Sequence, residues 1–309
     1  MSKKLKVYLT LEAGRQYSQH ILQSPLIKGV RWNTGAPTSD MKVKVLKDFQ
    51  SNIYPIKAWV DLKTRELRIT KKTTVPYNYL ELNHKIEVDT PTAMYYNEGK
   101  NVVIIKEVFD ENKLIVKLPD NFTGKETIKF GEGASINIPD DSLKINSYLT
   151  KTDKDYIEAA KHIGLHNYLL SFVETTEDIK ELLRLDPDAN IIAKIESKKG
   201  LHFVKNEFEQ IKNNIRLLVA RADLYIELDR PHEILGALRL IIKKDPNAIA
   251  ASRLLESFID VKSIPLCADF TDLGFLLEIG YKTFLLGDDL CQNEESLLSA
   301  LGVLNIMST

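Results

Sequence analysis

Two carboxylates stand in similar settings in this chain, each beside a short apolar run. Glu196 closes Ile-Ile-Ala-Lys194-Ile-Glu196, and Asp223 follows Leu-Leu-Val-Ala-Arg221-Ala. Each run is typical of a buried parallel strand, and residues two apart on a strand point the same way. Lys194 and Glu196 are therefore predicted to share a face, and so are Arg221 and Asp223. Hard oxygen ligands and cations at neighbouring strand ends predict a pocket for Mg²⁺ and an anionic substrate.

Short apolar runs recur along the chain at the spacing of a strand–helix repeat. Segments with helical periodicity separate most of them, for example at 176–184 and 232–242. Strands that alternate with helices favour a parallel sheet, and eight of them favour a closed (β/α)8 TIM barrel, whose active site lies at the carboxyl ends of the strands. The predicted strands cover residues 6–10, 29–33, 57–61, 168–173, 191–196, 216–221, 248–252 and 283–287.

The rhythm changes between about residues 72 and 140. Short alternating stretches at 85–89, 101–106, 113–117 and 135–139 are separated by turn residues. This pattern is typical of an antiparallel β-domain. We therefore expect a barrel domain of residues 1–71 and 141–309, with a small β-barrel-like lid inserted after strand 3 at residues 72–140. A helix is expected to resume at about residue 150, with Thr150 or Thr152 as a plausible N-cap.

The composition narrows the class of protein. The chain has 309 residues, 28% of them charged, and a net charge of −1. Such a balance gives no reason to expect a nucleic-acid or membrane partner. Two cysteines are too few for a disulfide scaffold and favour a reducing compartment. We find no signal peptide or apolar run long enough to span a bilayer, and expect a cytoplasmic protein.

Several motifs, in the same order along the chain, resemble the pyruvate kinase family. Lys194-Ile-Glu196 is similar to that family's Lys-Ile-Glu at the fifth strand, and Ala-Arg221-Ala-Asp223 to its Ala-Arg-Gly-Asp at the sixth. The resemblance implies a barrel with an inserted lid. Further similar segments are Arg31-Trp-Asn33, Asp61-Leu-Lys63-Thr-Arg-Glu-Leu-Arg68, Ser135-Ile-Asn-Ile-Pro139, Ser171-Phe-Val173, Ala251-Ser252-Arg-Leu-Leu-Glu-Ser257 and Pro265-Leu-Cys-Ala-Asp-Phe-Thr-Asp272.

The resemblance also implies roles for individual residues. Lys194 would neutralise the phosphoryl group in transfer and the enolate, and Arg31 would contact the phosphoryl group. Glu196 and Asp223 would hold Mg²⁺ (or Mn²⁺). Ser252, where the family has Thr, would help to deliver a proton, and the backbone at Ala222 and Asp223 would bind the substrate carboxylate.

The sequence departs from the family pattern on the nucleotide side and at the K⁺ site. Ala36 replaces a family His, and Gly131-Glu-Gly-Ala134 replaces a basic stretch, so a nucleotide partner is possible but weakened. Leu62 replaces a Thr of the K⁺ site, which leaves Asn33 and Asp61 for a monovalent cation, and a K⁺ requirement is doubtful. The chain stops after the eighth strand and one helix, so we expect a monomer or homodimer.

The leading interpretation is a Mg²⁺-dependent, pyruvate kinase-like phosphotransferase acting on phosphoenolpyruvate or pyruvate. One alternative is an aldolase or lyase that uses a pyruvate enolate, which would not need a nucleotide. Another is a non-catalytic protein that binds phosphoenolpyruvate. Simpler roles also exist for single residues: Arg221 is expected to form a structural pair, Arg253 an ion pair, and His232 to face solvent.

Overall fold

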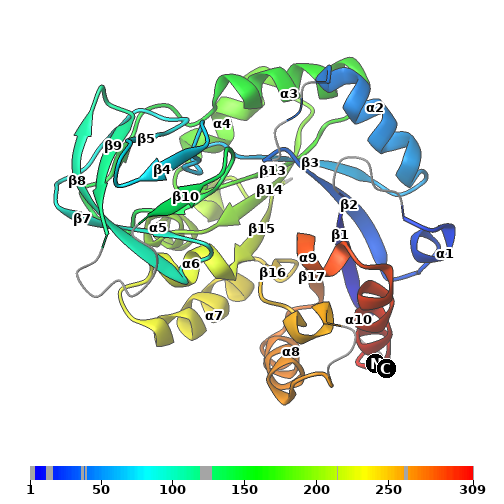
Figure 1. The fold of residues 1–309 in the computed structure, drawn as a ribbon. Coiled ribbons are helices and arrows are strands. Elements are labelled where there is room, and N and C mark those ends of the chain that lie inside the picture. The colour runs from blue at the N-terminus through cyan, green and yellow to red at the C-terminus, as the bar shows by residue number, and fades with distance from the viewer. Residues whose placement is uncertain are drawn as a thin grey trace.

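The computed structural model describes residues 4–11, 17–35, 38, 40–118, 127–213, 215–260 and 264–308. Eight parallel strands close into a barrel in the order β1-β17-β16-β15-β14-β13-β3-β2 (Figure 1). The barrel predicted from the apolar runs is thereby confirmed, and each run supplies one strand. The strands are β1 (Lys6–Leu11), β2 (Ile27–Asn33), β3 (Ala58–Leu62), β13 (Asn167–Leu170), β14 (Asn190–Ile195), β15 (Ile215–Ala220), β16 (Ile249–Ala251) and β17 (Thr283–Leu285).

Helices cover the outside of the barrel and bury their apolar faces on the strands. Thr150 is the N-cap predicted for α3: its hydroxyl accepts from the backbone of Asp153, whose carboxylate accepts from the backbone of Thr150. The helices are α1 (Gln19–Leu22), α2 (Lys42–Ile53), α3 (Lys151–His162), α4 (Thr176–Leu185), α5 (Lys198–Asn206), α6 (Arg221–Glu227), α7 (Ile234–Lys244), α8 (Cys267–Ile279), α9 (Asp288–Cys291) and α10 (Glu294–Ile306), with 3₁₀ turns η1 (Phe208–Gln210), η2 (Pro231–Glu233) and η3 (Glu256–Ile259).

The lumen of the barrel has its own apolar packing. Tyr8 and Trp59 meet edge to face there, with ring centroids 5.9 Å apart. A Cβ on Gly29 would come within 2.7 Å of the Tyr8 ring and 2.9 Å of Trp59. The close approach of these two rings therefore requires glycine at position 29. The side chains of the two rings and of their neighbours fill the lumen, so the barrel is a packed core.

An antiparallel insert follows β3, as the turn-rich pattern predicted. Five strands form its main sheet in the order β11-β7-β8-β9-β5, and two further pairs are β10-β4 and β12-β6. A separate apolar core, from Leu67 to Ile138, lies inside the insert. The strands are β4 (Thr73–Val75), β5 (Leu80–Glu81), β6 (Ile86–Glu87), β7 (Thr92–Tyr96), β8 (Asn101–Phe109), β9 (Lys113–Lys117), β10 (Ile128–Phe130), β11 (Ile136–Asn137) and β12 (Lys144–Ile145).

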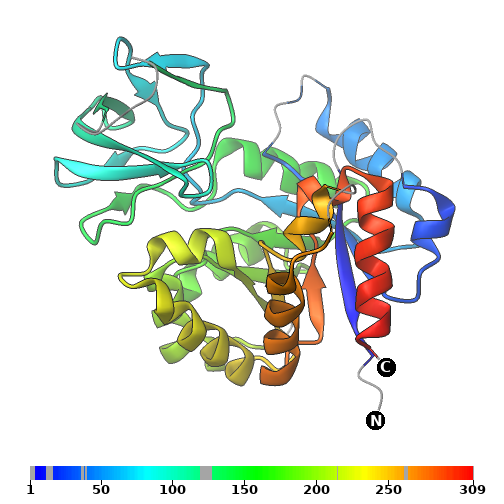
Figure 2. The ribbon, with the colours of Figure 1, turned by 60° about the horizontal axis from the view of Figure 1, so that its bottom comes forward.

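The insert lies beyond one end of the barrel, away from the chain termini (Figure 2). Since β1 begins near the N-terminus and runs toward the insert, the insert stands over the carboxyl ends of the strands. Within the described ranges, no helix is both long and apolar enough to cross a membrane.

Candidate active site

Lys194 and Glu196 lie together at the carboxyl end of β14, as their spacing predicted. Lys194 Nζ is 3.0 Å from Glu196 Oε1 and donates to Ser171 Oγ at 2.8 Å. It also lies 3.7 Å from Asp61 Oδ1, on β3. Burial by itself would lower the pKa of Lys194, but the carboxylates of Asp61 and Glu196 outweigh it and raise the pKa above its ordinary value. Lys194 is therefore a fixed cation on the floor of the site.

The carboxylates of Glu196 and Asp223 are both buried and carry raised pKa values. Burial raises the pKa of Glu196 to about 7; Lys194 opposes the rise and Asp223 adds to it. Burial and the Glu66 carboxylate raise the pKa of Asp223. Desolvated like charges disfavour ionisation until a cation neutralises them. Lys194 lowers the pKa of both carboxylates, but burial outweighs that effect and keeps both pKa values raised.

Arg221 does not point where strand alternation placed it. Strand β15 ends at Ala220, and Arg221 begins helix α6, so Asp223 lies in the first turn of a helix. The prediction that Arg221 and Asp223 share a face was wrong, because a helix turns about 100° per residue and a strand about 180°. Asp223 lines the central cavity, whereas the guanidinium of Arg221 turns away to Asp272. The structural pairing expected of Arg221 is confirmed.

Arg31 on β2 reaches two carboxylates. It donates through Nη1 to Asp61 at 3.3 Å and through Nη2 to Asp288, in α9, at 2.7 Å. Asp61 is fully buried and also accepts from Lys63 Nζ at 2.7 Å. Burial would raise the pKa of Asp61, but Lys194, Lys63 and Arg31 together lower it well below its usual range. Asp61 therefore remains ionised and holds three cations in place.

Asn33, the other residue considered for a monovalent cation, is likewise engaged. Its Nδ2 donates to Asp288 Oδ1 at 3.3 Å, and its Oδ1 accepts from the backbone of Gly35 at 3.1 Å. Asp61 is surrounded by protein cations. From the described residues, Asp61 Oδ1 accepts no hydrogen bond, and it lies 3.7 Å from Lys194 Nζ. A K⁺ site at Asn33 and Asp61 stays an untested prediction.

The predicted substrate residues line one cavity at the carboxyl end of the barrel. Its volume is about 290 Å³. Ser252 and Arg253, just after β16, have positive φ angles of 64° and 50°, a region that non-glycine residues rarely adopt outside functional loops. The loop after β16 is thereby turned toward the cavity. Among the predicted residues, those that line it are Arg31, Asn33, Lys194, Glu196, Ala222, Asp223 and Ser252.

The insert reaches this cavity at two points. Asn137 on β11 donates through Nδ2 to Asp223 Oδ1 at 3.3 Å. At the β7–β8 turn, the Glu98 carbonyl accepts from Arg253 Nη2 at 3.1 Å. Arg253 also stacks over the Tyr225 ring, so the ion pair expected for it is replaced by a backbone contact and an aromatic one. The insert therefore closes over the carboxyl end of the barrel.

Further charged residues belong to the site: Lys63 and Glu66 come from the segment 61–68 quoted above, whereas sequence reasoning missed Glu227. Lys63 and Glu66 follow β3 and are buried, and Glu66 accepts from Arg68 Nε at 3.0 Å. Glu227, in α6, lies beside Asn137, and burial raises its pKa to about 8. The spacing of Asp61 and Lys63 was a usable signal, since residues two apart at a strand end share a face. No local pattern marked Glu227, because the insert supplies its partner from 90 positions away in the chain.

Arg68 occupies the side of the site where the nucleotide-contacting segments were expected to be altered. Its Nη1 donates to the Gly133 carbonyl at 2.6 Å and to the Gly35 carbonyl at 3.1 Å. A Cβ on Gly35 would lie 2.5 Å from that guanidinium. The loops that contain Gly35 and Gly133 therefore both contact Arg68. Ala36 lies outside the described residues.

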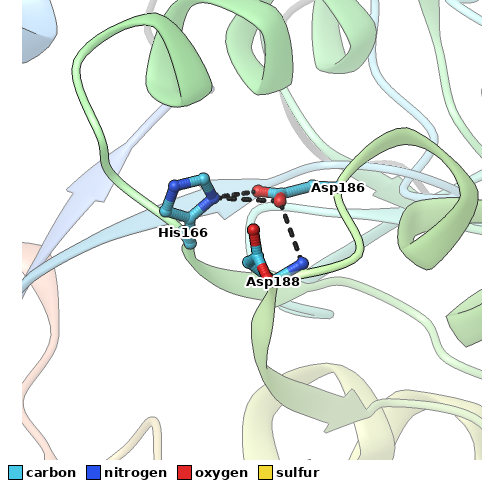
Figure 3. Close-up of side chains that lie close together, drawn as sticks. All are labelled: His166, Asp186 and Asp188. Carbon is cyan, nitrogen blue, oxygen red and sulfur yellow. Dashed lines mark hydrogen bonds and ion pairs between the residues drawn. The ribbon is translucent and has the colours of Figure 1, made fainter.

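A second cluster, of one histidine and two aspartates, lies at the amino ends of β13 and β14, and Figure 3 shows its side chains. The ligand atoms of His166, Asp186 and Asp188 are within 4.8 Å of one another. His166 Nδ1 is 2.8 Å from Asp186 Oδ2, which also accepts from Tyr168 Oη at 2.8 Å, and Asp186 Oδ1 accepts from the Asp188 backbone. Asp186 thereby fastens the loop between α4 and β14. These residues precede β13 and β14 and are remote from Glu196 and Asp223.

Fold and site together define a class of protein: a (β/α)8 barrel with a β-insert after its third strand and a cavity lined by acidic and basic side chains at the carboxyl ends of its strands. The family model described as the pyruvate kinase barrel domain matches residues 33–285. The chain belongs to the pyruvate kinase barrel family.

Individual relatives agree with this assignment. The chain is similar to a pyruvate kinase of Methanocaldococcus jannaschii, with 27% identity over 94% of this chain and 65% of the relative. It is similar to pyruvate kinase 1 of Saccharomyces cerevisiae, with 30% identity over 59% of this chain and 35% of the relative. A pyruvate kinase of Lachancea kluyveri is also 30% identical, over 60% of this chain and 36% of its own. The chain thus spans less than two thirds of the length of each of these relatives.

Proposed function

We propose that this protein catalyses phosphoryl transfer between phosphoenolpyruvate and a nucleoside diphosphate, with Mg²⁺ or Mn²⁺ as cofactor. One observation carries the proposal: Arg31 from β2, Lys194 and Glu196 from the end of β14, and Asp223 from α6 converge on a single cavity beneath the insert. Phosphoryl transfer depends on charge neutralisation and in-line positioning more than on covalent chemistry. Family membership supports the same reaction, since the relatives are pyruvate kinases.

The donor set fits a divalent cation. Glu196 and Asp223 are carboxylates, the ligands that Mg²⁺ prefers, and burial raises the pKa of each above its ordinary value. A bound cation would remove the cost of ionising them. When bound by Glu196 and Asp223, the metal would neutralise negative charge on the substrate. The cluster at His166 lies at the opposite end of the barrel and plays no part in this proposal.

The chain's own residues would then perform the remaining steps. Lys194, held beside Glu196, would stabilise negative charge on the phosphoryl group and on the enolate oxygen. Arg31 would contact the phosphoryl oxygens from the β2 side, after exchanging Asp288 for substrate. The backbone at Ala222 and Asp223, in the first turn of α6, would bind the substrate carboxylate. Ser252 would relay the proton that reaches the enolate carbon.

Residues 72–140 would act as a lid that excludes water from the reacting phosphoryl group. The contacts of Asn137 and Arg253 support this role, because each joins the insert to the barrel at the rim of the cavity. The acceptor would bind on the Arg68 side. A cytoplasmic location is proposed from the two cysteines, both of which are free thiols.

The test is a coupled assay of pyruvate release from phosphoenolpyruvate and Mg²⁺, with and without ADP and K⁺. Lys194→Met is expected to lower kcat by about 10²–10³-fold, the loss typical of one transition-state donor. Lys205→Met, which removes an exposed lysine of α5, is the matched control and should leave kcat unchanged. Binding of Mn²⁺, followed by calorimetry, should weaken in Glu196→Gln whether or not turnover is detected.

Two results would refute the kinase. Carbon–carbon cleavage of an added oxoacid, without ADP-dependent release of pyruvate from phosphoenolpyruvate, would indicate an aldolase or lyase. Metal-independent binding of phosphoenolpyruvate without turnover would indicate a non-catalytic binding protein.

A further inference from the structure

Basic residues gather at the amino end of the barrel, the end opposite the candidate active site. They lie near the amino ends of five strands, around a cavity of about 710 Å³. The net charge of the chain is −1, so the overall composition does not explain their concentration. The cations that line this amino-end cavity are Lys6, Lys28, Lys57, Lys212, Arg216 and Lys244.

Arg216 is the deepest of these cations. It is the second residue of β15, and its side chain alternates with those of Leu218 and Ala220, which belong to the packing of the lumen. It therefore enters the barrel from the amino end. Among the described residues, its hydrogen-bond partner is a neutral group: Nη1 donates to Tyr8 Oη at 2.9 Å. Partly buried arginines are ordinarily paired with a carboxylate or phosphate.

Acidic groups do not balance this cavity. Within the described ranges, Lys6, Lys28, Lys57, Lys244 and Arg216 form no ion pair within 4.0 Å; Lys212 pairs with Glu209. The one carboxylate in the lining is Asp245. Both of its oxygens are engaged, accepting from the backbone of Leu217 at 2.8 Å and of Asn247 at 2.8 Å.

The carboxyl-end cavity is different in this respect. There, Arg31, Lys63 and Lys194 each lie beside a carboxylate. Cations that line a cavity and lack carboxylate partners give that cavity a positive potential. Such a potential attracts multiply charged anions.

We propose that the amino-end cavity binds a small anion that carries two or more phosphate groups. The guanidinium of Arg216 presents a planar fork below the rim, which matches phosphate oxygens. Lys28 and Lys57, exposed on neighbouring strands, can reach a second phosphate from the rim. A volume of about 710 Å³ is in the range of pockets for small molecules. The site does not depend on the proposed kinase activity.

The experiment is isothermal titration of the whole chain with inorganic tripolyphosphate at low ionic strength, without divalent metal. The double variant Lys28→Gln/Lys57→Gln should raise Kd at least fivefold for each lysine, the effect of one unit charge about 4 Å away in water. Arg216→Gln should raise it further. Lys154→Gln, at an exposed position in α3, is the matched control and should leave Kd unchanged. Affinity should fall as salt is added.

Three results would overturn the proposal. The first is an equal Kd for the double lysine variant and Lys154→Gln, which would mean that the amino-end cavity is not the site. The second is a Kd raised by Arg31→Gln but not by the amino-end variants, which would place tripolyphosphate at the other end of the barrel. The third is a poly-glutamate peptide that binds as tightly and responds to the same variants, which would make the ligand an acidic segment. If Arg216→Gln fails to fold, the two exposed lysines still decide the outcome.

Discussion

We expect Arg221 to contribute more to the free energy of unfolding than any single contact made by the proposed substrate-binding residues. Its guanidinium donates through Nη2 to the Ser252 carbonyl at 2.8 Å and to the Arg253 carbonyl at 2.7 Å, and through Nη1 to both oxygens of Asp272 at 2.7 and 2.8 Å. It thereby holds the loop after β16 in its left-handed conformation. Arg221→Leu leaves both carbonyls and Asp272 without this partner.

The magnitude follows from the two carbonyl contacts. A hydrogen bond to a charged group contributes roughly 1.5–3 kcal/mol, so losing two gives about 3–6 kcal/mol, similar to the roughly 3–5 kcal/mol measured when one partner of a buried pair is removed. Asp272→Asn is the matched comparison. Its side chain is 34% exposed, so water can replace the carboxylate, and the expected loss is about 1 kcal/mol.

The measurement is urea unfolding of the wild type and both variants at pH 7, followed by circular dichroism. A loss below 1 kcal/mol for Arg221→Leu would refute the reasoning, because it would mean that the loop carbonyls do not depend on the guanidinium. Equal losses in Arg221→Leu and Asp272→Asn would place the energy in the ion pair instead of the loop.

Three further predictions concern the insert and the helix that follows it. Thr150→Ala removes the N-cap of α3 and should lower the free energy of unfolding by about 1 kcal/mol in urea titrations. An unchanged free energy of unfolding would mean that the cap does not stabilise the helix. Burial lowers the pKa of His84, so the contribution of the neutral imidazole to stability is complete above its ordinary pKa near 6.5 and is lost as pH falls through the lower folded value. The urea concentration at the midpoint of unfolding should therefore decrease below pH 6.5. His84→Asn should remove that decrease. Gly99 has a φ of +79°, and a Cβ there would lie 2.7 Å from Ile226, so Gly99→Ala should loosen the insert and speed proteolysis at the β7–β8 turn. Gly131→Ala, where a Cβ meets nothing within 4 Å, is its control, and equal cleavage of the two variants would contradict the role given to the Gly99 contact.

Local patterns predicted much of this architecture. The eight β-branched runs became the eight barrel strands, because burial on both faces of a parallel strand demands continuous apolarity. Turn residues marked the antiparallel insert for a similar local reason. Thr150 identified a helix start, since capping depends on residues three positions apart.

The pairing of charged residues could be predicted less well from the sequence than the strands and helices. Asp288 reaches Arg31 across the closure of the barrel, 257 positions away in the chain. Arg68 gathers two glycine loops, and Asn137 brings the insert to Asp223. Alternation even misplaced Arg221, because it could not reveal that the strand ends one residue earlier.

The sequence by itself therefore determined the order of strands and helices, the insert, and the residue types at the strand ends, all of which follow from periodicity and local hydrogen bonding. Only the tertiary structure decided which charges neutralise one another. Barrel closure joins the first strand to the last, and it leaves Arg31 paired at the carboxyl end while Arg216 faces an amino-end cavity without a carboxylate partner. Electrostatic pairing depends on distance in space, and separation along the chain does not encode that distance.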